Sequence, residues 1–532
     1  MSAVTDLART FGHPLALELD DKDAFPEQAF KELDDFGLNH YYVPKEYGGR
    51  LTSFEELLGL LRVVARHDLT VAIAHAKTLL GAISVWVSGD PAQAAWLGGR
   101  IVAGDLVSWG LSEREHGSDL LSGGVTAVLD RGTYRIDGEK WPINNAARGD
   151  LMTVLARTDA EGGPRGFDLV LVDRRHLAPG SYRCLPKELT RGIRGVEISG
   201  VVYTGALVPE SARVGAPGTG VETVLKGLQI SRTVCAALAL GGAEHALRLT
   251  VGPAFDLAPV RHDIAGSYAD LLAMEAMTIV CARAVHVLPA ELSVLSSVTK
   301  YAVPVWAEDI LGTLARLFGR SAVQDPMFVK LTRDVPIVGL FDGSTVVNLS
   351  ALINQFPTLA KERPGVRSTE AYDVRAPLPA FDPARLALLS LRGLSILDGL
   401  PGAVGRLPAG GLAERGGRLL EQLAALRAEL RAFSPGGATG RGRDAAERFE
   451  AAARLTSCVV GAAVIEVWLA NRNAEPGGLW AADAWPAAAL DRVLYRLGDR
   501  SPEDPARDGA LCGVLQDQIR SGRPISLFAE AR

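Results

Sequence analysis

The chain has 532 residues, of which 48% are hydrophobic, and its formal net charge is −6. At about 150 residues per domain, this length predicts roughly three or four domains, each with enough apolar residues for a core. The net charge is small for the size, so nucleic acid is not an expected partner. No apolar run reaches the roughly 18 residues that span a bilayer, and the N-terminus lacks the pattern of a secretion signal. We therefore expect a soluble, cytoplasmic protein with no membrane span.

The five cysteines and nine histidines give no sign of a disulfide framework or a metal centre. The cysteines are scattered and odd in number, and no Cys-x-x-Cys pair occurs. His67 and His75 are eight residues apart on an expected helix, which places them two turns apart. We expect buried thiols and no metal site.

The first 105 residues have the hydrophobic spacing of helices. Apolar residues recur at helical intervals over Ala29–Phe36 and Ser53–His67, and Val71–Trp86 is apolar on nearly all sides. A helix that is apolar all round belongs in a core. We expect an N-terminal helical domain over residues 1–105.

Between residues 106 and 215 the hydrophobic period falls to two, which is typical of strands. Short β-rich runs alternate with turn sequences such as Asp130-Arg131-Gly132 and Asp137-Gly138. Regularly spaced short strands of this kind predict a small antiparallel β-domain. The expected strands are Gly124–Leu129, Thr133–Ile136, Leu151–Ala156, Phe167–Val172 and Val196–Tyr203.

Helical spacing returns beyond residue 216 and predicts a helical domain over 216–362. Four prolines over residues 363–383 predict a linker, and residues 384–532 form an expected helical extension. The Gly-rich stretch Ser434–Arg443 lacks the Gly-Lys-Ser/Thr of a phosphate loop, so we expect an inter-helix loop there. The expected helices are Gly220–Leu249, Ile264–Leu288, Leu292–Phe318, Val346–Ala360, Ala384–Leu397, Leu412–Phe433, Asp444–Asn471 and Ala487–Leu497.

A Gly/Ser-containing loop, Trp109–Asp119, opens the expected β-domain. Backbone N–H groups in such a loop hold anionic or ring-carbonyl ligands, although a plain surface turn is the default for this loop taken alone. Further short motifs follow at ordered spacings. They are Lys140…Ile143-Asn144-Asn145, Gly192-Ile193-Arg194-Gly195, Val208-Pro209…Gly215, Arg232, and Arg333-Asp334…Asp342-Gly343-Ser344.

Taken together, these motifs resemble those of the acyl-CoA dehydrogenase family, over about residues 5–362. In that family Tyr-x-x-Thr-Glu-x-x-x-Gly-Ser-Asp begins the β-domain, and Arg-Asp precedes Glu-Gly-Thr. The resemblance implies a mainly α fold with a central antiparallel β-domain: a helical N-domain, a β-barrel-like middle domain and a C-terminal four-helix bundle. Residues 384–532 would add an all-α C-terminal domain, as in very-long-chain members of the family.

The resemblance also implies an FAD enzyme that introduces an α,β-double bond into an acyl thioester. A carboxylate removes the α-proton while hydride leaves the β-carbon for flavin N5. Asp342 falls at the position of the family's catalytic glutamate, and the apolar run Ile337–Phe341 before it fits a dry pocket. A helix N-cap is the alternative role for Asp342-Gly343-Ser344-Thr345, and both roles are compatible. Aspartate is shorter than glutamate by one methylene, or about 1.5 Å of reach.

The remaining site residues follow from the resemblance by position. Ser118, Arg232 and Gly343 would meet the acyl thioester or its carrier arm, with a helix-face ion pair as the alternative for Arg232. Glu113 and Asp119 are expected to cap the loop. The expected FAD contacts are Trp109, Leu111, Ser112, Ser118, Pro142, Ile143, Asn144, Ser344 and Thr345.

Three departures from the family pattern concern the flavin diphosphate and the substrate. The family's Arg-x-x-Phe-Gly loop is shortened to Gly252–Asp256, and its Gly-Gly-Asn-Gly turn reads Gly319-Arg320-Ser321-Ala322. An acidic residue three positions before the helix arginine is replaced by Gln229. Arg320 is a candidate for the missing diphosphate charge, and Trp141 for the family's indole at the position of Pro142.

The expected partners are an acyl thioester of coenzyme A or of an acyl-carrier protein, and an electron acceptor such as an electron-transfer flavoprotein. We expect a homodimer or homotetramer. Two other functions stay open: a flavin-dependent oxidase or monooxygenase on the same fold, and a non-catalytic scaffold without FAD.

Overall fold

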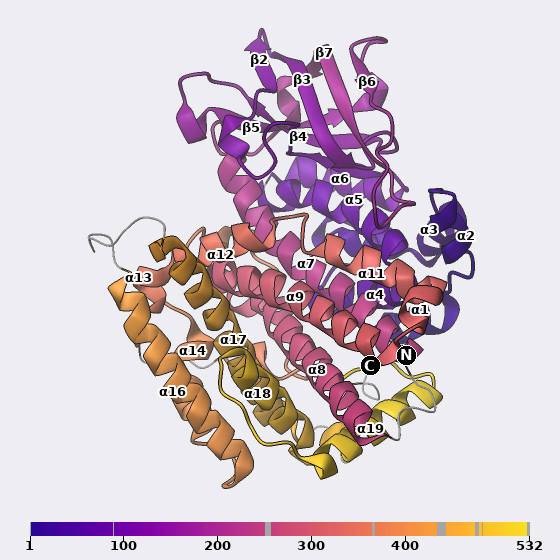
Figure 1. Ribbon diagram of the computed structural model, residues 1–532. Helices are drawn as coiled ribbons and strands as arrows, with labels where there is room; N and C mark the ends of the chain where they lie inside the picture. Colours follow the sequence, from indigo (N-terminus) through magenta and orange to yellow (C-terminus); the bar gives the residue numbers. More distant parts are fainter. Residues whose placement is uncertain are drawn as a thin grey trace. The chain divides into compact units, whose positions relative to one another are not determined.

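The computed structural model describes residues 2–88, 90–250, 257–363, 368–433, 443–473, 478–480 and 482–528 (Figure 1). It divides into two compact units. Unit 1 comprises Met1–Asp6, Arg232–Ala380 and Leu389–Arg532, and unit 2 comprises Leu7–Ser231 and Phe381–Leu388. The expected loop Ser434–Arg443, up to residue 442, and the shortened Gly252–Asp256 loop lie outside the described residues.

Unit 2 contains the expected N-terminal helices. The three helices expected from periodicity occur with ends within two residues of the expected ones, and the apolar α5 is buried along nearly its whole length. Periodicity missed α6, whose start is set by the N-cap Asp90 and by Pro91. The helices are α2 (Ala16–Asp21), α3 (Glu27–Phe36), α4 (Phe54–His67), α5 (Leu69–Ser88) and α6 (Pro91–Val102); α1 (Ala3–Thr10) begins in unit 1.

An eight-stranded sheet forms the rest of unit 2, with strand order β6-β7-β3-β2-β4-β5-β8 and with β1 paired to β4. Most pairs are antiparallel, as expected, but β1 and β2 each run parallel to β4. The strands are β1 (Val107–Gly110), β2 (Thr126–Asp130), β3 (Thr133–Asn144), β4 (Leu151–Arg157), β5 (Phe167–Asp173), β6 (Tyr182–Cys184), β7 (Ile198–Pro209) and β8 (Arg213–Val214).

The prediction that a strand ends at Ile136 is wrong, because β3 continues to Asn144. The expected turn at Asp137-Gly138 is instead an irregularity within the β3–β7 ladder. Gly138 has φ +129° and a Cβ there would lie 2.9 Å from Val125, so glycine lets the strand pass through this point. This continuation places Pro142, Ile143 and Asn144 on the same strand as Lys140.

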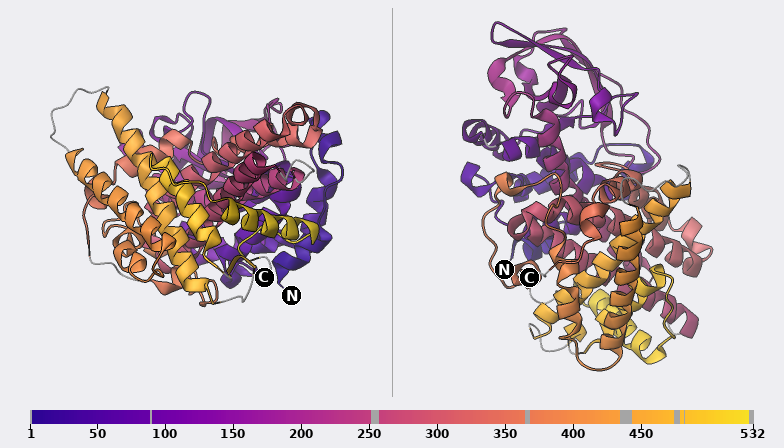
Figure 2. Two further views of the ribbon diagram at one scale, coloured as in Figure 1. Left: turned by 60° about the horizontal axis from the view of Figure 1, so that its bottom comes forward. Right: turned by 90° about the vertical axis from the view of Figure 1, so that its left-hand side faces the viewer.

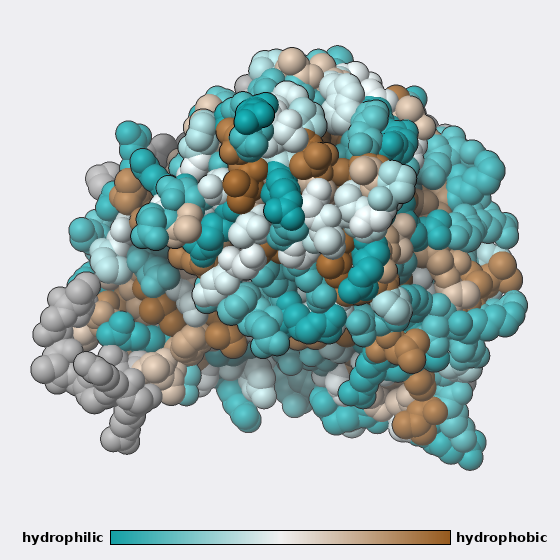
Figure 3. All heavy atoms as spheres, turned by 90° about the horizontal axis from the view of Figure 1, so that it is seen from above, coloured by the Kyte–Doolittle hydropathy of each residue, from teal (hydrophilic) through white to brown (hydrophobic). Residues whose placement is uncertain are grey.

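Helix α5 packs directly on the sheet and fixes the position of β1. A Cβ on Gly81 would lie 2.5 Å from the Val107 carbonyl oxygen, and the Thr153 hydroxyl donates to the Gly81 carbonyl at 2.7 Å. The Asn145 side chain donates to the Ala74 carbonyl at 2.9 Å. The surface seen from above in Figure 3 shows hydrophobic patches separated by hydrophilic residues.

Unit 1 is helical. Helix α7 begins in unit 2 and continues into unit 1, and α8 and α9 pack against each other. Its helices are α7 (Gly220–Leu249), α8 (Ala258–Val287), α9 (Leu292–Phe318), α10 (Ser321–Gln324), α11 (Pro326–Val338), α12 (Thr345–Ile353), α13 (Phe356–Leu359), α14 (Ser395–Asp398), α15 (Leu400–Val404), α16 (Gly411–Ala432), α17 (Arg443–Asn471), α18 (Ala484–Arg496) and α19 (Pro505–Arg520).

Two helix predictions are wrong, and a third helix, α8, begins at Ala258 rather than at the expected Ile264. The helix expected over Ala384–Leu397 is wrong: a short 3-10 turn, Pro383–Arg385, is followed by irregular chain up to α14. Gly393, at φ +89°, has a backbone conformation that an α-helix does not use. The helix expected over Val346–Ala360 is two helices, α12 and α13, which are separated around Asn354 and Gln355.

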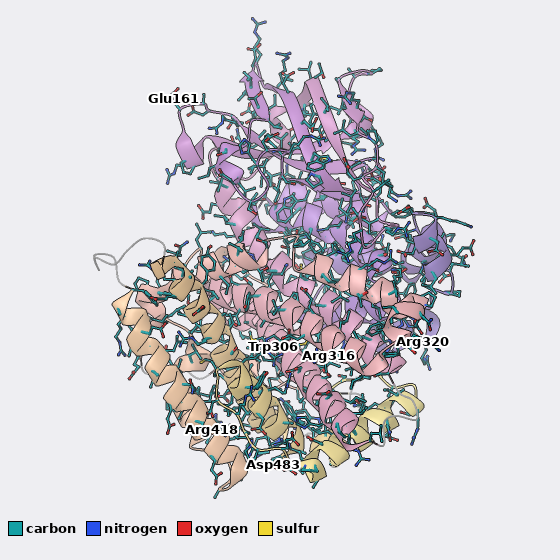
Figure 4. The ribbon with its side chains drawn as sticks, viewed as in Figure 1. Glu161, Trp306, Arg316, Arg320, Arg418 and Asp483 are labelled. Atoms are coloured by element: carbon teal, nitrogen blue, oxygen red, sulfur yellow. The ribbon has the colours of Figure 1, made fainter. Side chains whose placement is uncertain are left out.

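The C-terminal extension packs on the bundle within unit 1. Helix α17 lies against α8, α16 and α18, and the side-by-side arrangement is visible in Figures 1 and 2. Arg492 and Arg496 of α18 bind the buried Asp270 of α8 at 2.7 and 2.9 Å. Burial raises the pKa of Asp270, but the two guanidinium charges outweigh burial and lower it overall. Arg496 also covers the ring of Trp306, at 4.0 Å from the ring centroid; Trp306 is labelled in Figure 4.

The linker and the C-terminal segment are also held by buried charges of α8. Arg283, which is 1% exposed, donates to the carbonyl oxygens of Glu370 and Ala376 at 2.7 and 2.6 Å. The carboxylate of Glu275 accepts hydrogen bonds from the Ser526 hydroxyl and the Leu527 amide. Buried polar groups need such partners, so residues 368–380 and the segment around Ser526 are an integral part of unit 1.

Four helices are long and apolar enough to cross a membrane, which the count of uninterrupted apolar residues missed. In each helix, between 83% and 94% of the most apolar 18-residue stretch is buried inside the protein. Their apolar character is that of core helices. They are Leu69–Ser88, Gly220–Leu249, Pro259–Val287 and Ala445–Asn471.

Candidate active site

The loop that follows β1 is held by a buried ion pair in unit 2. Lys140 of β3 is 1% exposed, and its ammonium donates to Glu113 at 2.8 Å and to the Leu111 carbonyl at 3.1 Å. Glu113 also accepts from the amides of Gly124 and Val125 at 2.7 and 3.1 Å. Burial raises the pKa of Glu113, but the Lys140 charge and these hydrogen bonds outweigh burial and lower it. Glu113 is therefore an ionised group that closes the loop, as expected.

The end of β3 lies against the same loop. The Ser112 hydroxyl donates to the Pro142 carbonyl at 3.1 Å, and the Trp141 amide donates to the Ser112 carbonyl at 3.0 Å. The sequence motifs around Ser112 and around Pro142–Asn144, some thirty residues apart, thus meet at one place. Ile143 is buried, whereas Pro142 is exposed.

Trp141 has partners of its own. Its indole N–H donates to Glu188 at 2.8 Å, and the Arg114 guanidinium covers its ring at 4.3 Å from the centroid. One ring face is therefore already occupied. If Trp141 replaces the family's indole, the flavin has to contact the opposite face of the Trp141 ring.

Two buried polar atoms near this loop have no hydrogen-bond partner among the described residues: Trp109 Nε1 and Asn144 Oδ1. The Trp109 ring packs beside α7, where a Cβ on Gly227 would lie 3.5 Å from it. A buried donor and a buried acceptor without partners are rare in proteins, and they fit a planar ligand with ring carbonyl and N–H groups. Leu111 is partly buried, and Ser118 and Asp119 are exposed further along the loop, where Asp119 accepts from the Ser122 hydroxyl.

Asp342 lies in unit 1, in the turn between α11 and α12. Its φ of +54° and that of Gly343, +100°, are both left-handed. The helix N-cap is Ser344, whose side chain accepts from the Val347 amide, and Thr345 begins α12. Asn348 donates to the carbonyls of Gly343 and Ser344, both at 2.9 Å. The cap is thus supplied by Ser344, so the carboxylate of Asp342 is not required for it.

A buried arginine of α7 lies under this turn. Arg232 is 8% exposed and donates to the Ser297 hydroxyl at 3.3 Å. A Cβ on Gly343 would lie 3.3 Å from its Nε and Nη2 atoms. Burial lowers the pKa of Arg232 to about 10, although the negative charge of Asp342 acts in the opposite direction. The arginine stays charged at neutral pH, and its Nε has no hydrogen-bond partner among the described residues.

Two further side chains hold the Asp342 turn. Lys300 of α9, which is 1% exposed, donates to the Val338 carbonyl at 2.6 Å and lies 5.5 Å from the Phe341 ring centroid. The thiol of Cys235 donates to Asp342 Oδ2 at 3.6 Å. Of the apolar run before Asp342, Val338 and Gly339 are buried and Leu340 is 63% exposed.

The structure thus brings the expected site residues into two groups, one in each unit. The loop and β3 residues lie in unit 2, and Arg232, Asp342, Gly343, Ser344 and Thr345 lie in unit 1. The residue Gln229, at the position of the missing acid, is buried and donates to the Ala387 carbonyl at 2.8 Å. Arg320 is exposed beyond the end of α9 (Figure 4). Sequence reasoning missed Cys235, Lys300 and Asn348, because their role depends on contacts between elements.

Comparison with known proteins identifies the family. Three family models match in chain order: the N-terminal domain of acyl-CoA dehydrogenase over residues 1–105, the middle domain over 108–206 and the C-terminal domain over 218–355. The chain is 28% identical over 358 residues to the probable acyl-CoA dehydrogenase FadE25 of Mycobacterium tuberculosis, a match that covers 65% of this chain and 91% of the relative. It is 31% identical over 255 residues to cyclohex-1-ene-1-carbonyl-CoA dehydrogenase of Geobacter metallireducens, covering 47% and 66%.

Two solved structures share the fold. An acyl-CoA dehydrogenase of Bacillus anthracis, complexed with FAD, has a TM-score of 0.76 at 16% identity and covers 98% of this chain and 96% of its own. Butyryl-CoA dehydrogenase of Megasphaera elsdenii has a TM-score of 0.60 at 22% identity, covering 66% and 94%. The helical N-terminal region, the central sheet and the C-terminal helices are confirmed as the architecture of this fold. The chain therefore belongs to the acyl-CoA dehydrogenase family of FAD-dependent oxidoreductases.

Proposed function

We propose that the protein introduces an α,β-double bond into an acyl thioester, with Asp342 as the base that removes the α-proton. The observation that carries this proposal is the turn around Asp342, where Ser344 supplies the helix cap and the buried Arg232 guanidinium lies against Gly343 beside the Asp342 carboxylate. A positioned carboxylate acting as general base contributes about 10²- to 10⁴-fold to a rate.

Side chains of unit 1 restrain the base in this proposal. Asn348 and Lys300 hold the backbone on either side of Asp342, and the buried Arg232 places a positive charge beside the turn. This charge favours the negative charge that develops on the substrate when the α-proton leaves. Gly343 has no side chain, so in this proposal its backbone approaches the thioester beside the Arg232 guanidinium.

Residues of unit 2 hold FAD in this proposal. The residues proposed to bind the isoalloxazine ring are Trp109, Leu111, Ser112, Pro142, Ile143 and Asn144. The buried Trp109 Nε1 and Asn144 Oδ1 atoms, which have no hydrogen-bond partner among the described residues, support this assignment. When bound, FAD accepts the hydride from the substrate β-carbon. Ser118 is assigned to the flavin or to the carrier arm of the substrate, and Ser344 and Thr345 to the flavin.

The substrate carrier in this proposal is coenzyme A or an acyl-carrier protein, and an electron-transfer flavoprotein is the proposed acceptor. Relatives that act on CoA thioesters support the first assignment. We also propose a homodimer or homotetramer in the cytoplasm. No disulfide joins the five cysteines, all of which lie among the described residues, and this fits a reducing compartment.

The test is the variant Asp342→Asn, which keeps the side-chain shape and removes the base. We expect flavin absorbance to be retained and dehydrogenation of acyl thioesters to fall by about 10²- to 10⁴-fold. Glu362→Gln, which alters an exposed carboxylate of the same unit, is the control and should keep full activity. Full turnover by Asp342→Asn would refute the proposed mechanism and would favour an oxidase or monooxygenase on this fold.

A further inference from the structure

Cys235 is the side chain that contacts the carboxylate of Asp342 from α7. Its Sγ lies 3.6 Å from Asp342 Oδ2, within the range of a hydrogen bond to sulfur, and Cys235 is 1% exposed. Since a carboxylate without its proton is only an acceptor, the thiol is the donor. The two residues are 107 positions apart in the chain.

Cys235 and Arg232 occupy neighbouring positions on one face of α7, because residues three apart on a helix lie side by side. The negative charge of Asp342 acts on Arg232, which lies under Gly343, while the thiol contacts the carboxylate itself. The two α7 side chains therefore approach the same turn with different chemistry. Arg232 brings a full positive charge, and the Cys235 thiol is a weak, neutral donor.

We propose that Cys235 is a positioning residue for the base: its thiol holds Asp342 Oδ2 and so presents Oδ1 to the substrate α-proton. This inference rests on the proposed function of Asp342. Aspartate has two side-chain dihedral angles, and a hydrogen bond to one oxygen restricts the rotation of the carboxylate about the second. The thiol keeps its proton throughout, and the only proton that moves is the one from the substrate α-carbon to Oδ1.

A thiol suits this task better than a stronger donor. A hydrogen bond to the charged form of an acid lowers its proton affinity, and a strong donor would therefore weaken the base. The S–H group is a weak donor, so it orients the carboxylate with little loss of basicity. Serine at this position would be both a shorter side chain and a stronger donor.

The experiment compares Cys235→Ala, Cys235→Ser and Asp342→Asn in the FAD-loaded enzyme. Cys458→Ala is the matched control, because Cys458 is a fully buried thiol of the same unit on α17. We expect Cys235→Ala to lower kcat about ten-fold with little change in KM, because it disorders the carboxylate. Cys235→Ser should recover part of kcat, because its hydroxyl is still a donor. Cys458→Ala should keep the wild-type kcat and KM.

A spectroscopic signal tests the contact independently of turnover and also decides the matter if Cys235→Ala folds poorly. The S–H stretching band of Cys235, isolated as the wild-type minus Cys235→Ser infrared difference, should lie at the low frequency of a hydrogen-bonded thiol. Asp342→Asn should move it to higher frequency, since a neutral amide is a weaker acceptor. An unmoved band, or an unchanged kcat in Cys235→Ala while Asp342→Asn is inactive, overturns the inference. Full turnover by Asp342→Asn overturns the proposed function instead, whatever the band does.

Discussion

Replacing Glu113 by glutamine should destabilise the protein more than any change to an exposed ion pair. Lys140 is buried, and its ammonium lies 2.8 Å from the carboxylate of Glu113. The change leaves a buried positive charge without its counter-charge, and breaking a buried pair in this way costs about 3–5 kcal/mol. Because glutamine keeps one carbonyl acceptor for Gly124, Val125 or Lys140, we expect about 3 kcal/mol, at the lower end of this range.

The assay is urea unfolding of the flavin-loaded protein, followed by flavin fluorescence and by circular dichroism. The control is Glu18→Gln, which alters the exposed Lys22–Glu18 pair and should leave the unfolding free energy nearly unchanged. In the double variant Glu113→Gln with Lys140→Met, neither member of this pair is charged. Part of the unfolding free energy lost in Glu113→Gln should therefore be recovered. A loss below about 1 kcal/mol in Glu113→Gln would refute the reasoning, since the pair would then behave like an exposed one.

The same pair predicts a pH dependence. The pKa of Glu113 is lower in the folded protein than its ordinary value of 4.5, so its ionised form is favoured by folding. Its stabilisation is therefore fully present above about pH 4.5 and is lost as the pH falls through the folded-state pKa. The difference in unfolding free energy between the wild type and Glu113→Gln should be constant near neutral pH and should shrink in acid. A difference that grows in acid would contradict this assignment.

Two further substitutions test other parts of unit 1. Gly343→Ala places a Cβ 3.3 Å from Arg232 at a φ of +100°, so we expect a loss of about 1–3 kcal/mol in thermal unfolding together with reduced activity, whereas Gly417→Ala, at an open helical position, should be tolerated. Arg283→Met removes the donors to the Glu370 and Ala376 carbonyls, so limited proteolysis should cut the segment over residues 368–380 faster than in the wild type; an unchanged cleavage rate would show that other contacts hold this segment.

Local patterns in the sequence were sufficient for most elements and for the family. The helices Gly220–Leu249 and Leu292–Phe318 have the expected ends, because their apolar residues recur at helical spacing and turn residues delimit them. The resemblance in motifs was confirmed by three family models in the expected order. Ser344 has the residue type that a helix N-cap prefers, and the structure uses it in that role. The assignment of Asp342 as base and of the flavin contacts stays a prediction.

Contacts between distant residues were decided only by the tertiary structure. Gly138 reads locally as a turn residue, but pairing with β7 carries β3 through it, and the expected helix at Ala384–Leu397 is replaced by irregular chain. The pairing of Cys235 with Asp342 has no signature in the sequence, because it depends on how α7 packs against the turn that follows α11. Secondary structure follows from the periodicity of short segments, whereas the partners of a buried charge or thiol follow from the packing of whole elements.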